Sequence, residues 1–328
     1  MTPMSRRRFT AALALAAVAP RLARAQAGRQ YRIGWIGTSA ATHKEPYALG
    51  FVQRLGELGF VEGRNLVIER HHASNRVENF PAVAAMMAKT RYDALFATGS
   101  EANLAATIQA SRDAPIVVIA VDFDPVATGD VASLARPGGR VTGITAQQST
   151  LPAKRLELLK EMLPKARRVG VFSNEQTQGQ LSLVQGTARR MGLEVHVIDF
   201  RRPPFDFAAA FEDVVRQKCD ALFALGSAQF VSARREITQL ALKSRLPSVF
   251  HHSQWVEAGG LMSYGFNFAS MWRRGAEIVA SVLRGAKPAE TPMEAPASFE
   301  LAINLATARQ LGVTIPQSML VRVDRVVE

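Results

Sequence analysis

The chain is notable first for what it lacks. It has one cysteine, Cys219, among 328 residues, which excludes an intramolecular disulfide. No segment reaches the roughly 20 apolar residues that a transmembrane helix needs. Like charges do not gather in blocks of five or six, so the basic excess indicates a solvated surface and not a nucleic-acid site. The nucleophile-elbow, phosphate-loop, dinucleotide and zinc-protease motifs are missing, and we predict no enzyme of these classes.

The first 25 residues differ in kind from the rest. They contain a positive head at 6–8, an apolar stretch at 9–19 and a small-residue cleavage site, Ala-Arg-Ala, at 23–25. The run SRRRF at 5–9 resembles a twin-arginine export signal, with an ordinary secretory signal as the alternative. Cleavage removes five arginines and no acidic residue, so the formal charge falls from +12 to +7. Since no cysteine follows to carry a lipid, we expect a soluble periplasmic protein.

From residue 31 onward, short apolar runs alternate with segments of helical period. The apolar runs have no polar face, which is typical of parallel strands covered on both sides. This alternation predicts an α/β fold with parallel sheets. We predict strands at 32–36, 66–71, 94–98, 116–121, 169–173, 194–200, 221–225, 248–251 and 261–264, and helices at 47–58, 80–89, 102–111, 153–162, 181–191, 207–217 and 232–243.

An internal duplication organises this pattern. The octapeptide DALFATGS at 93–100 recurs as DALFALGS at 220–227, with one difference. Three flanking matches follow in the same order: 32–36 with 168–172, 58–59 with 191–192, and 114–116 with 246–248. The chain therefore predicts two similar Rossmann-like lobes, which create a cleft between them.

Candidate ligand contacts follow from the rule that open parallel sheets bind ligands beyond the carboxyl ends of their strands. Both repeat copies place glycine and serine at such an end, Gly99-Ser100 and Gly226-Ser227. The glycine permits close approach of a ligand, and the serine either donates to a carboxylate or caps the next helix. We predict that the polar head of the ligand contacts Ser39, Gly99, Ser100 and Ser227. Its opposite end would contact Asp122, Asn174 and Glu175, and its apolar body would contact Tyr47, Phe123 and Tyr264.

Other residues near strand ends give weaker indications of function. The aromatic residues Phe230 and Trp255 are either ligand contacts or core. Adjacent histidines at 71–72 and 251–252 would point to opposite sides of a strand, so we predict no metal site and no cofactor. Asp122 and Asp124 share a loop, but no nucleophile or activated base accompanies them, and catalysis is not predicted.

Several segments resemble the ABC-transporter substrate-binding proteins of the tryptophan/phenylalanine type. The most specific is VEAGGLMSYG at 256–265, and the others are LGFVEGRNL at 58–66, DPV at 124–126, VASLARPGGRVTG at 131–143, KRLELLK at 154–160 and FELAIN at 299–304. The resemblance implies a type I periplasmic-binding fold with a three-segment hinge. The lobes would comprise 28–145 with about 265–290, and 146–264 with about 291–328. Gly143 and Tyr264-Gly265 are the expected hinge positions.

The function that this resemblance implies is non-enzymatic capture of a small organic solute, an amino acid or an aromatic or carboxylate compound. A monomer would deliver it to an ABC permease and its ATPase at the inner membrane. This chain departs from the family in having Ser227 at a commonly acidic position and Asn174-Glu175 in place of Asn-Pro. A ligand ammonium then lacks its natural partner unless Glu101, Asp122 or Glu175 replaces the acid.

Three alternatives stay open at this point. A repressor with the same fold would need a helix-turn-helix where the export signal lies. An exported sensor would present its liganded form to a membrane receptor. An exported α/β enzyme would turn its ligand over, whereas a binding protein returns it unchanged.

Overall fold

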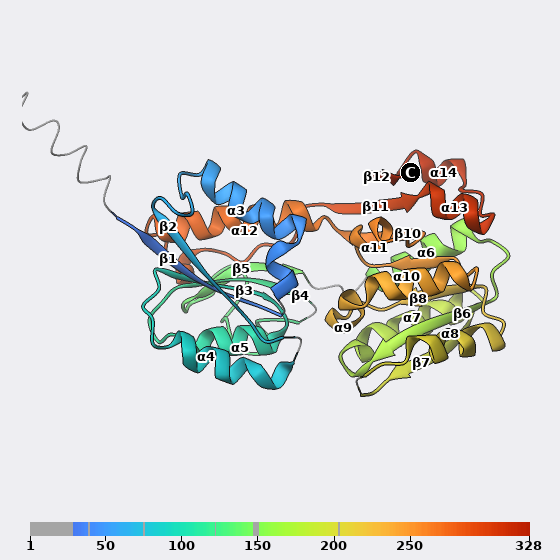
Figure 1. The fold of residues 1–328 in the computed structure, drawn as a ribbon, viewed down its shortest axis with the longest axis horizontal. Helices are drawn as coiled ribbons and strands as arrows, with labels where there is room; N and C mark the ends of the chain where they lie inside the picture. The colour runs from blue at the N-terminus through green and yellow to red at the C-terminus, as the bar shows by residue number, and fades with distance from the viewer. Residues whose placement is uncertain (1–28, 39, 75, 122, 147–150, 203) are drawn as a thin grey trace, which may run out of the picture.

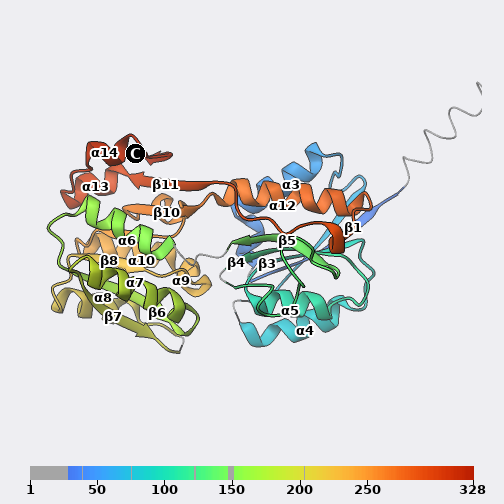
Figure 2. The ribbon, with the colours of Figure 1, turned by 180° about the vertical axis from the view of Figure 1, so that it is seen from behind.

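The computed structural model describes residues 29–328 except 39, 75, 122, 147–150 and 203. The predicted signal at 1–25 and the predicted contacts Ser39 and Asp122 lie outside the described residues. Within them the protein forms two lobes side by side, each built on one sheet, as two opposite views show (Figures 1 and 2). We call the lobe with the five-stranded sheet the N-lobe and the lobe with the seven-stranded sheet the C-lobe.

The N-lobe sheet is entirely parallel and has the order β2-β1-β3-β4-β5. Helices α3 and α12 cover one face, and α4 and α5 cover the other (Figure 1). Covering both faces explains why these strands read as continuous apolar runs. The bounds are β1 (Tyr31–Gly37), β2 (Leu66–His72), β3 (Ala94–Gly99), β4 (Ile116–Val121), β5 (Val141–Ala146), α3 (Pro46–Glu57), α4 (Phe80–Met87), α5 (Glu101–Gln109) and α12 (Phe268–Leu283), with 3-10 turns at Ala40–Lys44, Val77–Asn79 and Pro288–Glu290.

The C-lobe sheet has the order β12-β11-β10-β9-β8-β6-β7. Core clusters on its two faces include residues of α6, α7 and α13 on one side and of α8 and α10 on the other. The bounds are β6 (Arg168–Asn174), β7 (Glu194–Phe200), β8 (Ala221–Ala224), β9 (Ser248–Phe250), β10 (Met262–Phe266), β11 (Phe299–Asn304), β12 (Arg325–Val327), α6 (Leu151–Met162), α7 (Gln178–Arg190), α8 (Phe207–Arg216), α9 (Ala228–Ser232), α10 (Arg234–Lys243), α11 (Gln254–Glu257), α13 (Leu305–Leu311) and α14 (Gln317–Leu320), with a 3-10 turn at Glu175–Thr177.

The duplication is visible in the topology, because β7-β6-β8-β9-β10 repeats the order β2-β1-β3-β4-β5. It is visible in side chains too. Asp93 accepts a hydrogen bond from the Arg32 amide at 2.8 Å, and Asp220 accepts one from the Arg168 amide at 2.9 Å. In each lobe, an aspartate just before the third strand of the repeat therefore holds the start of its first strand. The predicted pair of Rossmann-like lobes is confirmed.

The chain passes between the lobes in the segment after β5, between β10 and α12, and again before β11. Because the chain leaves the C-lobe along β10 and returns along β11, these two strands are antiparallel, an exception to the predicted parallel pairing. The returning segment stays on the N-lobe as far as Glu294, whose amide donates to the Gly143 carbonyl at 2.9 Å. The residue boundaries given above for the two lobes stay a prediction.

The nine predicted strands and seven predicted helical segments are all present, with ends displaced by a few residues. The predicted helix 232–243 spans parts of two helices, because α9 ends at Ser232 and α10 begins at Arg234. Strands β5, β11 and β12 were not predicted. No helix in the described part of the chain is long and apolar enough to cross a membrane.

Candidate ligand-binding site

A pocket of about 280 Å³ lies between the lobes. This volume is just below the roughly 300–1,000 Å³ of typical small-molecule sites, so it suits a compact solute and not a peptide or an oligosaccharide. Both lobes contribute to its walls. The lining residues are Thr38, Thr42, Glu45, Tyr47, Thr98, Gly99, Ser100, Ile119, Val121, Phe268 and Trp272 from the N-lobe and Ser227, Val231, Ser232, Arg234, His251 and His252 from the C-lobe.

The N-lobe wall is built from strand ends and one returning helix. Thr38, Thr42 and Glu45 follow β1, Gly99 ends β3 and Ser100 follows it, all at the carboxyl edge of the parallel sheet where ligands are expected. Gly99 has φ +95, a conformation that a residue with a Cβ atom adopts only under strain. Glycine here therefore sets the path of the chain from β3 into α5.

Aromatic side chains form the apolar part of this wall. The ring of Tyr47 lies 4.7 Å from that of Trp272 and 5.7 Å from that of Phe268, measured between centroids. Burial, and then the neighbouring Glu45 carboxylate, raise the pKa of Tyr47 above its ordinary value, so the phenol stays protonated. The three rings offer a surface for a planar or apolar ligand group.

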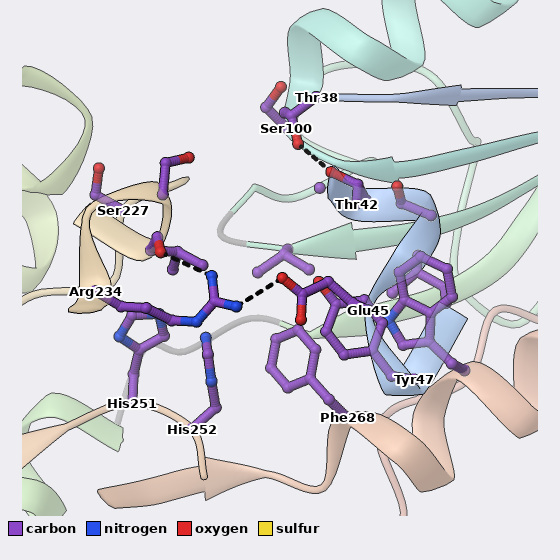
Figure 3. Close-up of a pocket in the computed structure, with 17 residues that line it drawn as sticks. Thr38, Thr42, Glu45, Tyr47, Ser100, Ser227, Arg234, His251, His252 and Phe268 are labelled. Carbon is purple, nitrogen blue, oxygen red and sulfur yellow. Dashed lines mark hydrogen bonds and ion pairs between the residues drawn. The ribbon is translucent and has the colours of Figure 1, made fainter. Parts of the chain in front are cut away.

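The C-lobe wall presents one cation. Arg234 is the first residue of α10, and its guanidinium Nη2 meets Glu45 Oε1 of the N-lobe at 2.7 Å (Figure 3). Gln254, the first residue of α11, donates to the other Glu45 oxygen at 3.1 Å. Both side chains of the ion pair are mostly buried, with exposed fractions of 20% and 15%. Glu45 is therefore held by two C-lobe residues across the pocket.

His251 and His252 lie beside this ion pair, and both line the pocket (Figure 3). Their ring centroids are 4.6 Å apart. Burial, followed by neighbouring charges that include Arg155, lowers the pKa of His251 and lowers that of His252 to about 3. Both rings are therefore neutral at any physiological pH. Their Nδ1 atoms are buried without a hydrogen-bond partner among the described residues.

This placement corrects the argument from strand alternation. Strand β9 ends at Phe250, one residue before His251, so the two histidines lie in the bend that follows and are not held on opposite faces of a strand. They reach the same pocket. No group of three or more His, Cys, Asp or Glu side chains suited to a metal ion occurs in the described part of the chain.

The two repeat serines occupy equivalent positions and behave alike in one respect. Ser100 precedes α5 and Ser227 precedes α9, and neither hydroxyl caps its helix. Both line the pocket instead. They differ in their partners, because Ser227 accepts a hydrogen bond from Asn174 Nδ2 at 2.7 Å. A pair of hydroxyl groups thus faces the pocket from opposite lobes.

The predicted site residues are only partly brought together. Tyr47, Gly99, Ser100 and Ser227 line the pocket. Asn174 is buried behind Ser227 and also donates to Gln229, so it supports the wall without lining it.

Three other predicted contacts lie outside the lining. Glu175 is exposed, Phe123 packs on the core beside α4 and α5, and Tyr264 packs between the cores of the two lobes. Phe230 and Trp255 are core residues of the C-lobe, which decides between their two readings.

Pocket-lining residues that we did not predict as ligand contacts include Glu45, Arg234, His251, His252, Phe268 and Trp272. The two histidines lie at the end of the predicted strand 248–251. Glu45 and Arg234 gave no signal, because each is an ordinary charged residue at the start of a helix. Their pairing depends on how the lobes meet.

Comparison with known proteins gives a consistent result. A family model described as ABC transporter substrate binding protein matches residues 43–327. The chain belongs to this family. A tyrosine-binding protein of Clostridioides difficile (strain R20291) is 27% identical over 265 residues, which are 80% of this chain and 75% of that protein.

Solved structures of similar fold extend the comparison. A conserved domain protein of Vibrio cholerae has a TM-score of 0.80 at 24% identity, covering 91% of this chain and 100% of that one. An ABC domain from Streptococcus pneumonia in complex with L-Trp has a TM-score of 0.78 at 22% identity, with the same coverage. At these identities the two structures establish the type I periplasmic-binding fold for this ABC substrate-binding protein, and the resemblance predicted from the sequence is confirmed.

Proposed function

We propose that the protein is the periplasmic substrate-binding component of an ABC importer. It captures a small organic molecule with a carboxylate and an apolar body in the pocket between its lobes, and aromatic amino acids are the first candidates. The observation that carries the proposal is the pocket itself, which is small, lined from both lobes and divided into a polar and an aromatic part. The family membership supports the transport role.

The polar part suits a carboxylate. Arg234 supplies a guanidinium, and the hydroxyl groups of Ser100 and Ser227 lie in the same lining. Charge-assisted hydrogen bonds from a guanidinium to a carboxylate are among the strongest polar contacts in proteins. Tyr47, Phe268 and Trp272 then cover the apolar body. A tyrosine-binding relative and a tryptophan-bound neighbour favour an aromatic group there.

Capture would couple to closure of the lobes. A ligand that touches both walls binds the closed arrangement better than the open one, and only such differential affinity shifts the equilibrium between them. A permease that recognises the closed arrangement would then distinguish loaded from empty protein. The predicted hinge at Gly143 and Tyr264-Gly265 and the predicted monomeric state belong to this proposal.

The test is a thermal-shift and calorimetric titration of the protein without residues 1–25 against L-tryptophan, L-tyrosine and L-phenylalanine, together with 3-phenylpropanoate and indole-3-propionate. At a hundred times its dissociation constant, a true ligand adds about 2.7 kcal/mol of stability, which raises the Tm of a chain of this length by about 4 °C. Mass spectrometry of the recovered compound checks that it returns unchanged. A compound consumed by the protein would contradict the binding role.

A matched pair of variants places the site. Val231 lines the pocket, whereas Val215 is an exposed valine on α8 outside it. V231W fills the pocket with an indole ring and should abolish the shift, while V215W should leave it intact. If V231W binds as well as the parent protein, the ligand does not occupy this pocket.

A further inference from the structure

The pocket has a distinctive distribution of charge. Among its described lining residues, Glu45 and Arg234 are the only ones that carry a formal charge at neutral pH. The histidines beside them are neutral, and the other polar side-chain groups are the hydroxyl groups of serine, threonine and tyrosine and the indole N–H of Trp272. One negative and one positive charge thus face each other from opposite lobes, and the lining as a whole has no net charge.

The two charges are placed differently with respect to their helices. Glu45 is the N-cap residue of α3, where the positive end of the helix dipole stabilises a carboxylate. Arg234 stands at the first position of α10, where the same dipole disfavours a cation, but its guanidinium also reaches the Val231 carbonyl in the last turn of α9, where a cation is favoured. Glu45 is the anion that faces it in the structure.

Partners around the ion pair allow an exchange. The Arg234 guanidinium donates through Nη2 to Glu45 and through Nη1 to the Val231 carbonyl at 3.2 Å. Gln254 holds the second Glu45 oxygen, so the carboxylate stays oriented toward the pocket when Arg234 turns to another anion. A ligand carboxylate can thus replace Glu45 on the guanidinium while Glu45 remains in place.

The charge of the ligand decides whether that exchange leaves a charge uncompensated. A simple carboxylate on Arg234 would leave Glu45 as a mostly buried anion next to a second anion, which is costly. A simple amine on Glu45 would leave Arg234 without its anion. A zwitterion compensates both, because its carboxylate replaces Glu45 and its ammonium replaces Arg234.

We propose that Glu45 and Arg234 together read the charge of the ligand and select a zwitterion, with the ligand carboxylate on Arg234 and its ammonium on Glu45. The inter-lobe ion pair of the free protein is the internal substitute for that ligand. Glu45 then binds the ligand ammonium, which the uncharged Ser227 cannot pair with. This inference rests on the proposed function and narrows its ligand class from carboxylates in general to zwitterions.

The experiment compares three compounds for each of three side chains. For tryptophan, tyrosine and phenylalanine, calorimetry measures the affinity of the amino acid, of its deaminated acid and of its decarboxylated amine. The parent protein should bind at least one amino acid about 10- to 100-fold more tightly than either truncated analogue, as expected for loss of a charged hydrogen bond.

The variants should separate the two ends of the ligand. E45Q should lose about 10- to 100-fold in affinity for the amino acid and bind the deaminated acid as well as the parent or better. R234Q should lose affinity for the amino acid to a similar extent and spare the amine, and R234K should recover part of the loss. Circular dichroism and the Tm of each variant establish that it is folded.

The matched control is E161Q. Glu161 pairs with Arg322 at 2.5 Å in the C-lobe, outside the pocket lining, so its loss removes an ion pair of similar kind. E161Q should leave all affinities unchanged. A parent protein that binds a deaminated acid as tightly as the amino acid overturns the charge-reading pair and leaves the proposed function standing.

Three other outcomes also overturn the inference. If E45Q and R234Q raise the affinity for all compounds alike, the ion pair is a latch that competes with any ligand. If E45Q loses acid and amino acid equally, Glu45 only positions the wall. If none of the nine compounds binds the parent protein, the charge-reading pair and the proposed ligand class both fall.

Discussion

The two lobes share a frame and differ where that frame ends. In each, an aspartate anchors the first strand of the repeat, and the arginine of that strand pairs with a glutamate on the edge strand beside it, Arg32 with Glu69 and Arg168 with Glu194. The carboxyl ends diverge. The N-lobe presents Glu45 and three aromatic rings to the pocket, and the C-lobe presents Arg234 and two neutral histidines.

This difference shows which parts of a duplicated fold are free to change. Strand starts are tied to neighbouring backbone by hydrogen bonds that require particular side chains, so both copies keep them. Strand ends lead into loops, which tolerate change because few backbone contacts depend on them. The complementary charges of the two pocket walls lie in this part of the repeat.

The largest test of the shared frame uses two glycines in equivalent strands. A Cβ atom on Gly143 of β5 would lie 1.9 Å from the Val118 carbonyl oxygen, and one on Gly265 of β10 would lie 1.8 Å from the His251 carbonyl oxygen. Because backbone must move in both cases, G143A and G265A should each lower the free energy of unfolding by about 3 kcal/mol. Urea denaturation measures the loss.

The control for these variants is G186A. Gly186 lies inside α7, and a Cβ atom there would make only an ordinary contact, 3.9 Å from the Arg190 side chain, so alanine should stabilise the helix by about 0.5–1 kcal/mol. If only one of the two strand glycines is required, then β5 and β10 are not equivalent in packing, and the two lobes share topology alone.

A second test concerns the buried histidines of the C-lobe wall. The folded protein lowers the pKa of His252 to about 3, whereas the unfolded chain takes up a proton near the ordinary value of 6.5. Unfolding therefore binds protons in acid, and stability falls as the pH drops below about 6.5. His252 alone should cost about 2 kcal/mol between pH 7 and pH 5, and H252Q should remove that part of the acid sensitivity.

Urea denaturation at several pH values measures this profile. An H252Q variant as acid-sensitive as the parent would show that His252 is not held neutral in the folded protein.

The smallest expected effect separates the two repeat serines. S227A leaves Asn174 without one of its acceptors and should cost about 1 kcal/mol of stability. S100A removes a hydroxyl that does not cap its helix and should change stability by less than about 0.5 kcal/mol. Thermal or urea unfolding of both variants measures the difference, and equal losses would mean that Ser100 has a structural role like that of Ser227.

Much of the fold was predictable because apolar runs and helical periods report burial locally. The strands that escaped prediction have identifiable reasons. Strand β5 contains two threonines and a glycine in VTGITA, so it lacks a continuous apolar run. Strand β11 begins with an exposed phenylalanine and a glutamate, and β12 has only three residues.

The site was less predictable than the fold. Gly99, Ser100 and Ser227 were found because a repeated motif at a strand end is a local signal. Glu45 and Arg234 are 189 positions apart in the chain, and nothing near either residue indicates the other. Phe268 and Trp272 reach the N-lobe wall only because α12 follows the second crossing between the lobes.

The order of residues by itself determined the two-lobed α/β architecture, its internal duplication and the edge of each sheet where a ligand would bind, since periodicity and repetition are properties of short segments. Only the tertiary structure decided which side chains face one another across the pocket, which aromatic residues are wall and which are core, and that the histidines lie side by side. Those outcomes depend on the packing of one lobe against the other, which brings distant residues within hydrogen-bond distance and determines how far each is buried from solvent.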